Sequence, residues 1–77
     1  MFQAQPVIIT IVPVRGGFAV REKSSFNFTT FPKFNHALNC ARARASYRTG
    51  EIHICDKLGL AIRKIPFSFK RKEVKNK

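Results

Sequence analysis

The side chains best suited to chemistry in this sequence are two histidines and two cysteines, which form the pairs His36-x-x-x-Cys40 and His53-x-Cys55. Imidazole and thiolate are the usual ligands of structural zinc. The strand alternation around His53, however, turns that residue and Cys55 away from the face that packs on the helix. His36 and Cys40 lie outside the apolar stripe of the helix. We therefore expect no metal site, and two free, partly buried thiols in a reducing compartment.

The acidic residues offer no basis for catalysis. There are only four of them, and Asp56 occupies a turn where its side chain serves its own backbone. No general acid and base pair is apparent, and no third group orients a cysteine and a histidine as a nucleophile. Gly16-Gly17 joins two strands, so it is a hairpin turn and no phosphate loop. We predict a protein that is not an enzyme, with no cofactor and no small-molecule substrate.

The basic residues dominate the charge of the chain. Fifteen Lys and Arg against four acids give a net charge of +11 in 77 residues. Solvated surfaces usually mix both signs, so this excess favours a polyanion as the partner. The cations fall on the helix, on the sheet face away from the helix (Arg21, Lys23 and Arg63) and in the C-terminal tail. The helix contains no acid, so no ion pair between successive turns is expected to relieve its arginines.

Double-stranded DNA, bound through phosphate contacts, is the partner that we predict, with a role as a small transcriptional regulator or accessory factor. Base stacking on Phe26, Phe28, Phe31 and Phe34 would favour RNA or a single strand, but we expect these rings in the core. The other alternative is a protein-interaction module or effector that docks on an acidic protein surface. The residues expected to contact the nucleic acid are Arg15, Arg21, Lys23, Lys33, Arg42, Arg44, Arg48, Arg63, Lys64, Lys70, Arg71 and Lys72.

Length and hydrophobicity limit the class of protein. A chain of 77 residues forms one domain at most, and one this small is marginally stable without a disulfide, a metal or a second subunit. No apolar run is long enough to span a membrane, and the run from Val7 to Val14 lacks the flanks of a secretory signal. We expect a cytoplasmic protein with no membrane partner.

Two hairpins and a helix are predicted from the residue pattern. The β-branched run at residues 7–14, Gly16-Gly17 and residues 18–24 form the first hairpin. Residues 32–48 form a helix that begins at Pro32, capped by Thr30 or Phe31, with Phe34, Leu38, Ala41 and Ala45 along one face. Residues 51–56 and 60–66 form the second hairpin.

The predicted fold is therefore α+β with the order ββαββ. It has a four-stranded antiparallel sheet made from two hairpins, and one helix packs on one face of that sheet. Residues 1–69 form the single domain, and residues 70–77 form a basic tail that we expect to be disordered unless bound.

The first strand predicts a dimer. It is apolar on both faces, although the helix can cover only one of them. The economical cover for the other face is a second copy of the chain, because closed two-fold dimers are the commonest oligomers. Ile8, Thr10 and Val12 are the predicted interface.

A family resemblance is carried by Pro13-x-x-Gly16-Gly17-Phe18-Ala19-Val20, the helix segment Ala41-Arg42, Ile52-His53-Ile54-x-Asp56 and a closing Gly-x-x-Ile. These motifs resemble those of a family of short bacterial domains of uncharacterised function, across roughly residues 9–65. The resemblance implies the ββαββ layout in a bacterial protein and, for some members, a dimer that binds DNA. This chain differs in having Phe18 where Trp is usual, a longer second turn, and a helix without the family's acids.

Overall fold

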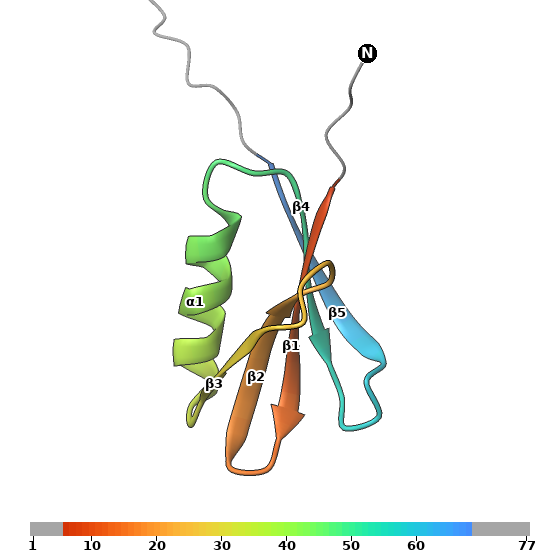
Figure 1. Cartoon of the computed structure of the whole chain (residues 1–77). Coiled ribbons are helices and arrows are strands. Elements are labelled where there is room, and N and C mark those ends of the chain that lie inside the picture. The colour runs from red at the N-terminus through yellow and green to blue at the C-terminus, as the bar shows by residue number, and fades with distance from the viewer. Residues whose placement is uncertain (1–5, 69–77) are drawn as a thin grey trace, which may run out of the picture.

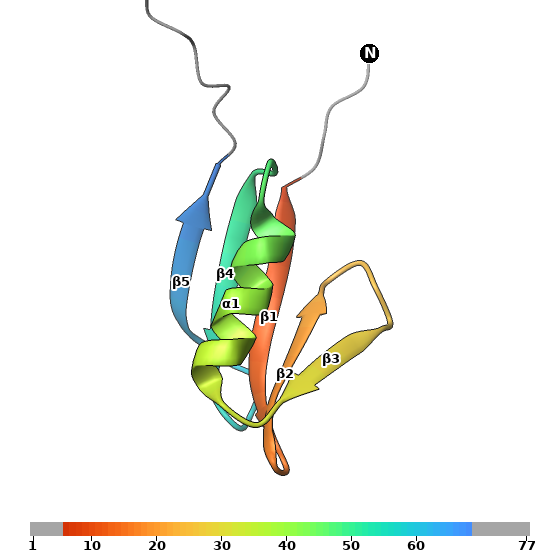
Figure 2. The ribbon, with the colours of Figure 1, turned by 90° about the vertical axis from the view of Figure 1, so that its left-hand side faces the viewer.

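The computed structural model describes residues 6–68, which fold into five strands and one helix. In chain order these are β1 (Val7–Val14), β2 (Gly17–Glu22), β3 (Phe28–Phe31), α1 (Phe34–Ala45), β4 (Gly50–Cys55) and β5 (Ala61–Phe67). The strands form one sheet in the order β3-β2-β1-β4-β5, and α1 lies against one face of it (Figures 1 and 2). The predicted α+β class, with one helix on one face of the sheet, is confirmed.

The prediction of four antiparallel strands is wrong, and one missed element explains the error. The segment Phe28–Phe31 is a fifth strand that pairs antiparallel with β2, with Thr29 opposite Val20. β3 takes the chain across the sheet once more before α1. β4 therefore runs in the same direction as β1, with Ile9 beside Ile52. A four-residue edge strand carries too little pattern to be recognised, yet it reverses the direction of everything that follows it.

The bounds of the elements differ from the prediction mainly at the helix. The first strand has the predicted residues, and the other three predicted strands shift by one or two positions. The helix begins at Phe34, and its N-cap is Lys33 in an extended conformation with no side-chain cap. The predicted caps, Thr30 and Phe31, belong to β3 and pair with β2. At the other end Tyr47 reverses the chain with a φ of 63°, so the helix stops before residue 48.

The core lies between α1 and the three strands β1, β2 and β4. Its largest fully buried side chains are Ile9, Ile11, Val20 and Ile52. The helix presents Ala37, Ala41 and Ala45, all buried, so that its backbone can approach the sheet closely. At one end of the core the rings of Phe18 and Phe34 meet edge to face, with centroids 5.5 Å apart. The predicted apolar face of the helix is thus confirmed.

Two of the four phenylalanines that we expected in the core lie outside it. Phe31 and Phe34 pack against the core, whereas Phe28 is 61% exposed and Phe26 is 95% exposed. Phe28 lies on the face of β3 that points away from α1, opposite Arg21 of β2. The alternation of the missed strand therefore decides which rings are buried.

The glycines of the first hairpin are required by its geometry. Gly16 has a φ of 85°, which an L-amino acid adopts only under strain. At Gly17 a Cβ atom would clash with the backbone carbonyl of Phe31. These glycines let the turn reverse and let β3 end directly against it.

The two faces of β1 differ in their cover. Ile9 and Ile11 lie under α1 and are buried, whereas Ile8, Thr10 and Val12 point to the opposite face and are only half-buried. We call the sheet face away from α1 the outer face.

Within residues 6–68, α1 is too short and too polar to cross a membrane.

Candidate nucleic-acid interface

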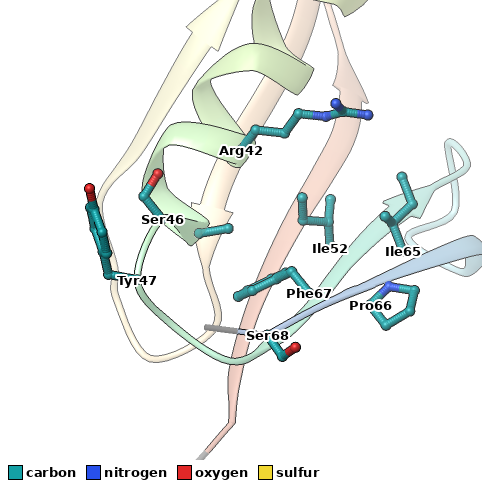
Figure 3. Close-up of a pocket in the computed structure, with 9 residues that line it drawn as sticks. Arg42, Ser46, Tyr47, Ile52, Ile65, Pro66, Phe67 and Ser68 are labelled. Carbon is teal, nitrogen blue, oxygen red and sulfur yellow. The ribbon is translucent and has the colours of Figure 1, made fainter. Parts of the chain in front are cut away.

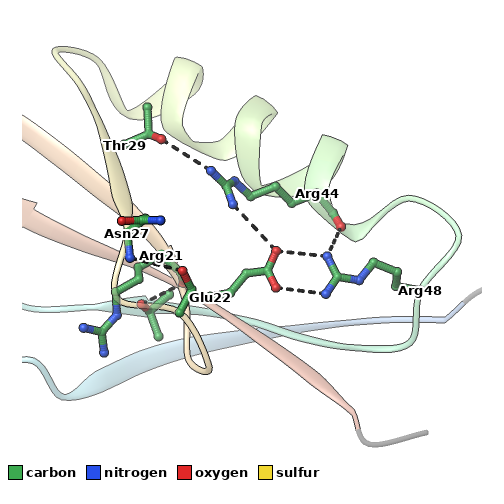
Figure 4. A network of polar contacts seen from close by, with 8 residues as sticks. Arg21, Glu22, Asn27, Thr29, Arg44 and Arg48 are labelled. Atoms are coloured by element: carbon green, nitrogen blue, oxygen red, sulfur yellow. Dashed lines mark hydrogen bonds and ion pairs between the residues drawn. The ribbon is translucent and has the colours of Figure 1, made fainter.

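Arg44 of α1 and Arg48 of the following loop, both predicted to contact nucleic acid, are held by an acid from the sheet. Arg48 donates from Nη1 and Nη2 to the two carboxylate oxygens of Glu22, at 3.0 and 2.9 Å (Figure 4). Arg44 Nη1 lies 3.6 Å from the same carboxylate, and its Nη2 donates to Thr29 Oγ1 at 3.3 Å. The acid that relieves the charge of these arginines comes from β2 and not from the helix, a partner that was not predicted from the sequence.

This cluster, formed by Glu22, Arg44 and Arg48, ties the end of β2 to the end of α1. Arg48 Nη1 also donates to the backbone carbonyl of Arg44 at 3.0 Å, which caps one of the last carbonyls of the helix. The hydrogen bonds from Arg48 hold the pKa of Glu22 below its ordinary value of 4.5, and the charges of both arginines add to this. The same pairing raises the pKa of Arg48. The acid and the arginines of this cluster are therefore charged, and their role is to hold β2 against the end of α1.

The other two acids of the described residues also have assigned roles. Glu51 Oε1 lies 2.7 Å from His53 Nε2 on the outer face. Asp56 Oδ1 accepts hydrogen bonds from the backbone N–H groups of Leu58 and Leu60, both at 2.9 Å, and so closes the β4–β5 turn as predicted. Neither acid forms an ion pair with a lysine or an arginine among residues 6–68.

The remaining cations are exposed and, within residues 6–68, have no acidic partner. They are Arg15, Arg21, Lys23, Lys33, Arg42, Lys57, Arg63 and Lys64. Seven of them were predicted as binding residues from the sequence. Lys57 was not predicted as a binding residue; its place within the turn between Asp56 and Gly59, where side chains are normally exposed, is the sequence signal that would have identified it. Lys70, Arg71 and Lys72, with the rest of the predicted tail, lie outside the described residues.

Three of these cations lie at the same end of the sheet. Because β1 and β4 are parallel, the β1–β2 turn and the β4–β5 turn leave the sheet at the same end, where α1 also begins (Figure 1). Arg15, Lys33 and Lys57 therefore all lie at this end of the sheet, which we call the turn end. Leu58 and Leu60 of the β4–β5 turn are 83% and 61% exposed, so this end offers apolar as well as cationic contacts.

The outer face carries three further cations. Arg21 pairs with Thr10 across β1 and β2, Lys23 follows two residues later, and Lys64 pairs with His53. They share this face with the predicted dimer interface. Arg63 was predicted to lie there too, and that prediction is wrong: it pairs with Ile54, whose side chain packs on the core side of the sheet.

A groove of about 640 Å³ runs between the end of α1 and β5 (Figure 3). The helix contacts β1, β2 and β3, and so leaves this flank of the sheet open. Ile52, Ile65 and Phe67 form its apolar floor, and Arg42 and Tyr47 stand at its rim. Tyr47 is 81% exposed.

The two pairs of histidine and cysteine lie on different elements, His36 and Cys40 on α1 and His53 and Cys55 on β4. Residues 6–68 contain no cluster of three or more metal-ligating side chains. Cys40 and Cys55 are free thiols, and Cys55 is buried. Burial and the nearby charge of Asp56 raise the pKa of Cys55, which disfavours its nucleophilic thiolate form.

Comparisons with known proteins give no family for this chain. No family model, no curated protein and no solved structure matches it. The resemblance to short bacterial domains stays a prediction.

Proposed function

We propose that this protein is a non-enzymatic, dimeric DNA-binding protein that contacts the phosphates of a duplex through its turn end. The observation that carries the proposal is that Arg15, Lys33 and Lys57 lie in three different connections at the same end of the sheet, all exposed and with no acidic partner among residues 6–68. Lysine and arginine bind phosphate oxygens in this way without regard to sequence.

Two further features of the same end favour an anion. The first turn of α1 contains no acidic residue, so the positive end of the helix dipole there is not offset. Leu58 and Leu60 provide exposed apolar side chains beside the cations. In the major groove of DNA such side chains can contact thymine methyl groups. The basic stretch at residues 70–77 would add phosphate contacts.

The dimer is the second part of the proposal. Ile8, Thr10 and Val12 form a half-buried strip along the central strand of the outer face. A second copy that covered this strip would also cover Arg21, Lys23 and Lys64, which share the face. We therefore assign these three cations to the dimer interface and the turn end to DNA. The protein would then act on a duplex as a regulator or accessory factor.

A salt titration of duplex binding tests the proposal. Binding should weaken with salt, and the variant R15A/K33A/K57A should reduce the slope of log K against log salt by about 0.9 per lost phosphate contact, or up to about 2.7 for each subunit that contacts the duplex. The charge-preserving variant R15K/K33R/K57R is the control and should keep the slope. Duplex binding no tighter than about 10⁻⁴ M at physiological salt would rule out the proposal. Docking on an acidic protein would then be the better interpretation.

The groove beside α1 favours a second candidate, which is binding of single-stranded nucleic acid or RNA. Its apolar floor and the exposed ring of Tyr47 could stack an unpaired base, with Arg42 beside the phosphate. The variant R42A/Y47A should then weaken binding of a single-stranded oligonucleotide and leave duplex binding unchanged. Equal effects on both ligands would count against this candidate.

A further inference from the structure

The outer face carries its charges in an order that is complementary to itself. Lys23 lies opposite Ile8 across β2 and β1, where its backbone N–H donates to the Ile8 carbonyl at 2.8 Å. At this level, from β2 to β5, the residues on the outer face are Lys23, Ile8, Glu51 and Pro66. At the next level, from β3 to β5, they are Phe28, Arg21, Thr10, His53 and Lys64. On this face β1 separates Arg21 and Lys23, which directly follows β2, from Glu51 of β4 and Lys64 of β5.

We propose that a second copy of the chain covers the outer face through a two-fold axis that runs along β1, midway between the two sheets. The proposal rests on the dimer proposed above and fixes its geometry. Such an axis lays β1 on its own copy, exchanges the positions of β2 and β4, and keeps the level along the strands. Lys23 of each copy then faces Glu51 of the other, and Arg21 faces His53.

The alternative axis, perpendicular to the strands, is opposed by charge. It would keep each strand over its own copy and reverse the levels along it. An axis level with Thr10 would set Arg21 against Arg21 and Lys64 against Lys64, and an axis level with Ile8 would set Lys23 against Lys23. Like charges that are brought together across an interface are costly. The axis along β1 avoids these contacts and also sets Lys64 over the ring of Phe28, which is 61% exposed.

The apolar part of the face fits the same arrangement. Ile8, Thr10 and Val12 meet their own copies at the centre, at the spacing of about 10 Å that packed sheets adopt. A shallow hollow of about 310 Å³ between β1, β2 and β3, lined by Val12, Val14, Ala19 and Phe28 among others, receives side chains from the other copy. The interface thus has an apolar centre and charged pairs at its sides.

One consequence connects this dimer to the turn end. An axis along the strands leaves the two turn ends at the same end of the dimer. Arg15, Lys33 and Lys57 of both copies then lie on one surface, related by the same two-fold axis. A DNA duplex that binds at this end, on the two-fold axis, would contact two symmetric sets of cations.

Charge reversal at Lys23 and Glu51 tests the arrangement in the full chain. K23E sets two carboxylates against each other twice in each dimer, and E51K sets two lysines together twice, so each should weaken association about tenfold or more in sedimentation equilibrium. The double variant K23E/E51K restores both contacts and should recover association. A one-to-one mixture of K23E and E51K should form heterodimers, detected by native mass spectrometry, because both contacts are then between opposite charges.

The mixture separates contacts between copies from effects within one chain, since only association brings Lys23 and Glu51 of different chains together. R42E is the control: it changes net charge as K23E does but lies on the other side of the sheet, so association should be unchanged. Thermal unfolding of each variant checks that the fold is kept. A wild-type monomer at tens of micromolar would overturn the dimer itself. A wild-type dimer with no preference for heterodimers in the mixture would overturn this arrangement alone.

Discussion

Strand β1 is apolar on both faces of the sheet, but α1 covers only one of those faces. Under α1, Ile9 and Ile11 are 0% and 1% exposed and form the centre of the core. On the outer face Ile8, Thr10 and Val12 are half-buried, because no helix lies over them. Both faces have apolar residues on the same strand, and only one of them is covered within the described part of the chain.

The two faces also differ in whether their acid is paired with a basic residue of the same chain. On the covered side, Glu22 is only 18% exposed and is neutralised within the chain by Arg48 and Arg44. On the outer face, the side chain of Glu51 is 46% exposed and lies 2.7 Å from His53 Nε2, while Lys23 lies two strands away. The comparison teaches that the acid of the covered face is compensated inside the fold, whereas the cations of the outer face are left to the second copy that we propose to cover it.

The largest expected effect comes from paired truncations of neighbouring isoleucines on β1. Ile9→Ala should lower the free energy of unfolding by about 2–5 kcal/mol, because it leaves a cavity in the core. Ile8→Ala should cost the isolated chain only about 1 kcal/mol, because Ile8 is half-buried. Chemical denaturation at several protein concentrations measures both.

The concentration dependence is the informative part. The loss from Ile9→Ala should be the same at every concentration, whereas the loss from Ile8→Ala should grow as the dimer forms. Equal and concentration-independent losses would mean that the outer face is not an interface.

A smaller effect is expected from the acid on the covered face. Because the folded-state pKa of Glu22 is lowered, its ionisation stabilises the fold above pH 4.5, and this contribution is lost as pH falls through the lowered pKa. Glu22→Gln should therefore cost about 1 kcal/mol or less at pH 7, since Arg48 is 37% exposed. The difference from wild type should shrink in urea titrations toward pH 3.

The corresponding change on the outer face serves as the control. Glu51→Gln should leave the stability of the dilute monomer nearly unchanged, because no lysine or arginine among residues 6–68 pairs with it. A pH dependence of equal size for both variants would remove the distinction between the two faces.

The smallest expected effect concerns the strained end of α1. Tyr47 has a φ of 63°, where an L-residue is disfavoured and glycine is not. Tyr47→Gly should raise the free energy of unfolding by about 0.5 kcal/mol, after the greater freedom of glycine in the unfolded chain is deducted. Tyr47→Ala keeps the strain and should not stabilise. If both variants destabilise equally, contacts of the ring outweigh the backbone strain.

Part of the fold could be predicted from patterns of neighbouring residues in the sequence. The β-branched run gave the first strand at its observed residues, and the periodicity of Phe34, Leu38, Ala41 and Ala45 gave the face of the helix that packs on the sheet. The glycines and Asp56 gave both hairpin turns. These features depend on residues close together in the chain, where periodicity and turn chemistry act directly.

Only part of the candidate site could be predicted from the sequence. The sequence identified most of the exposed cations, but it counted Arg44 and Arg48 among them and placed Arg63 on the wrong face. It could not show that Glu22 reaches the helix, because the partners are more than twenty residues apart. Nor did it reveal the turn end, which exists only because β1 and β4 are parallel.

By itself the sequence determined the charge excess, the helix face, the turns and a central strand that is apolar on both sides. The tertiary structure decided which cations are neutralised and which lie at the same end of the sheet. The physical reason is the direction of the chain: one short edge strand, weak in local pattern, adds a crossing of the sheet. That crossing sets β4 parallel to β1 and brings both hairpin turns to the same end.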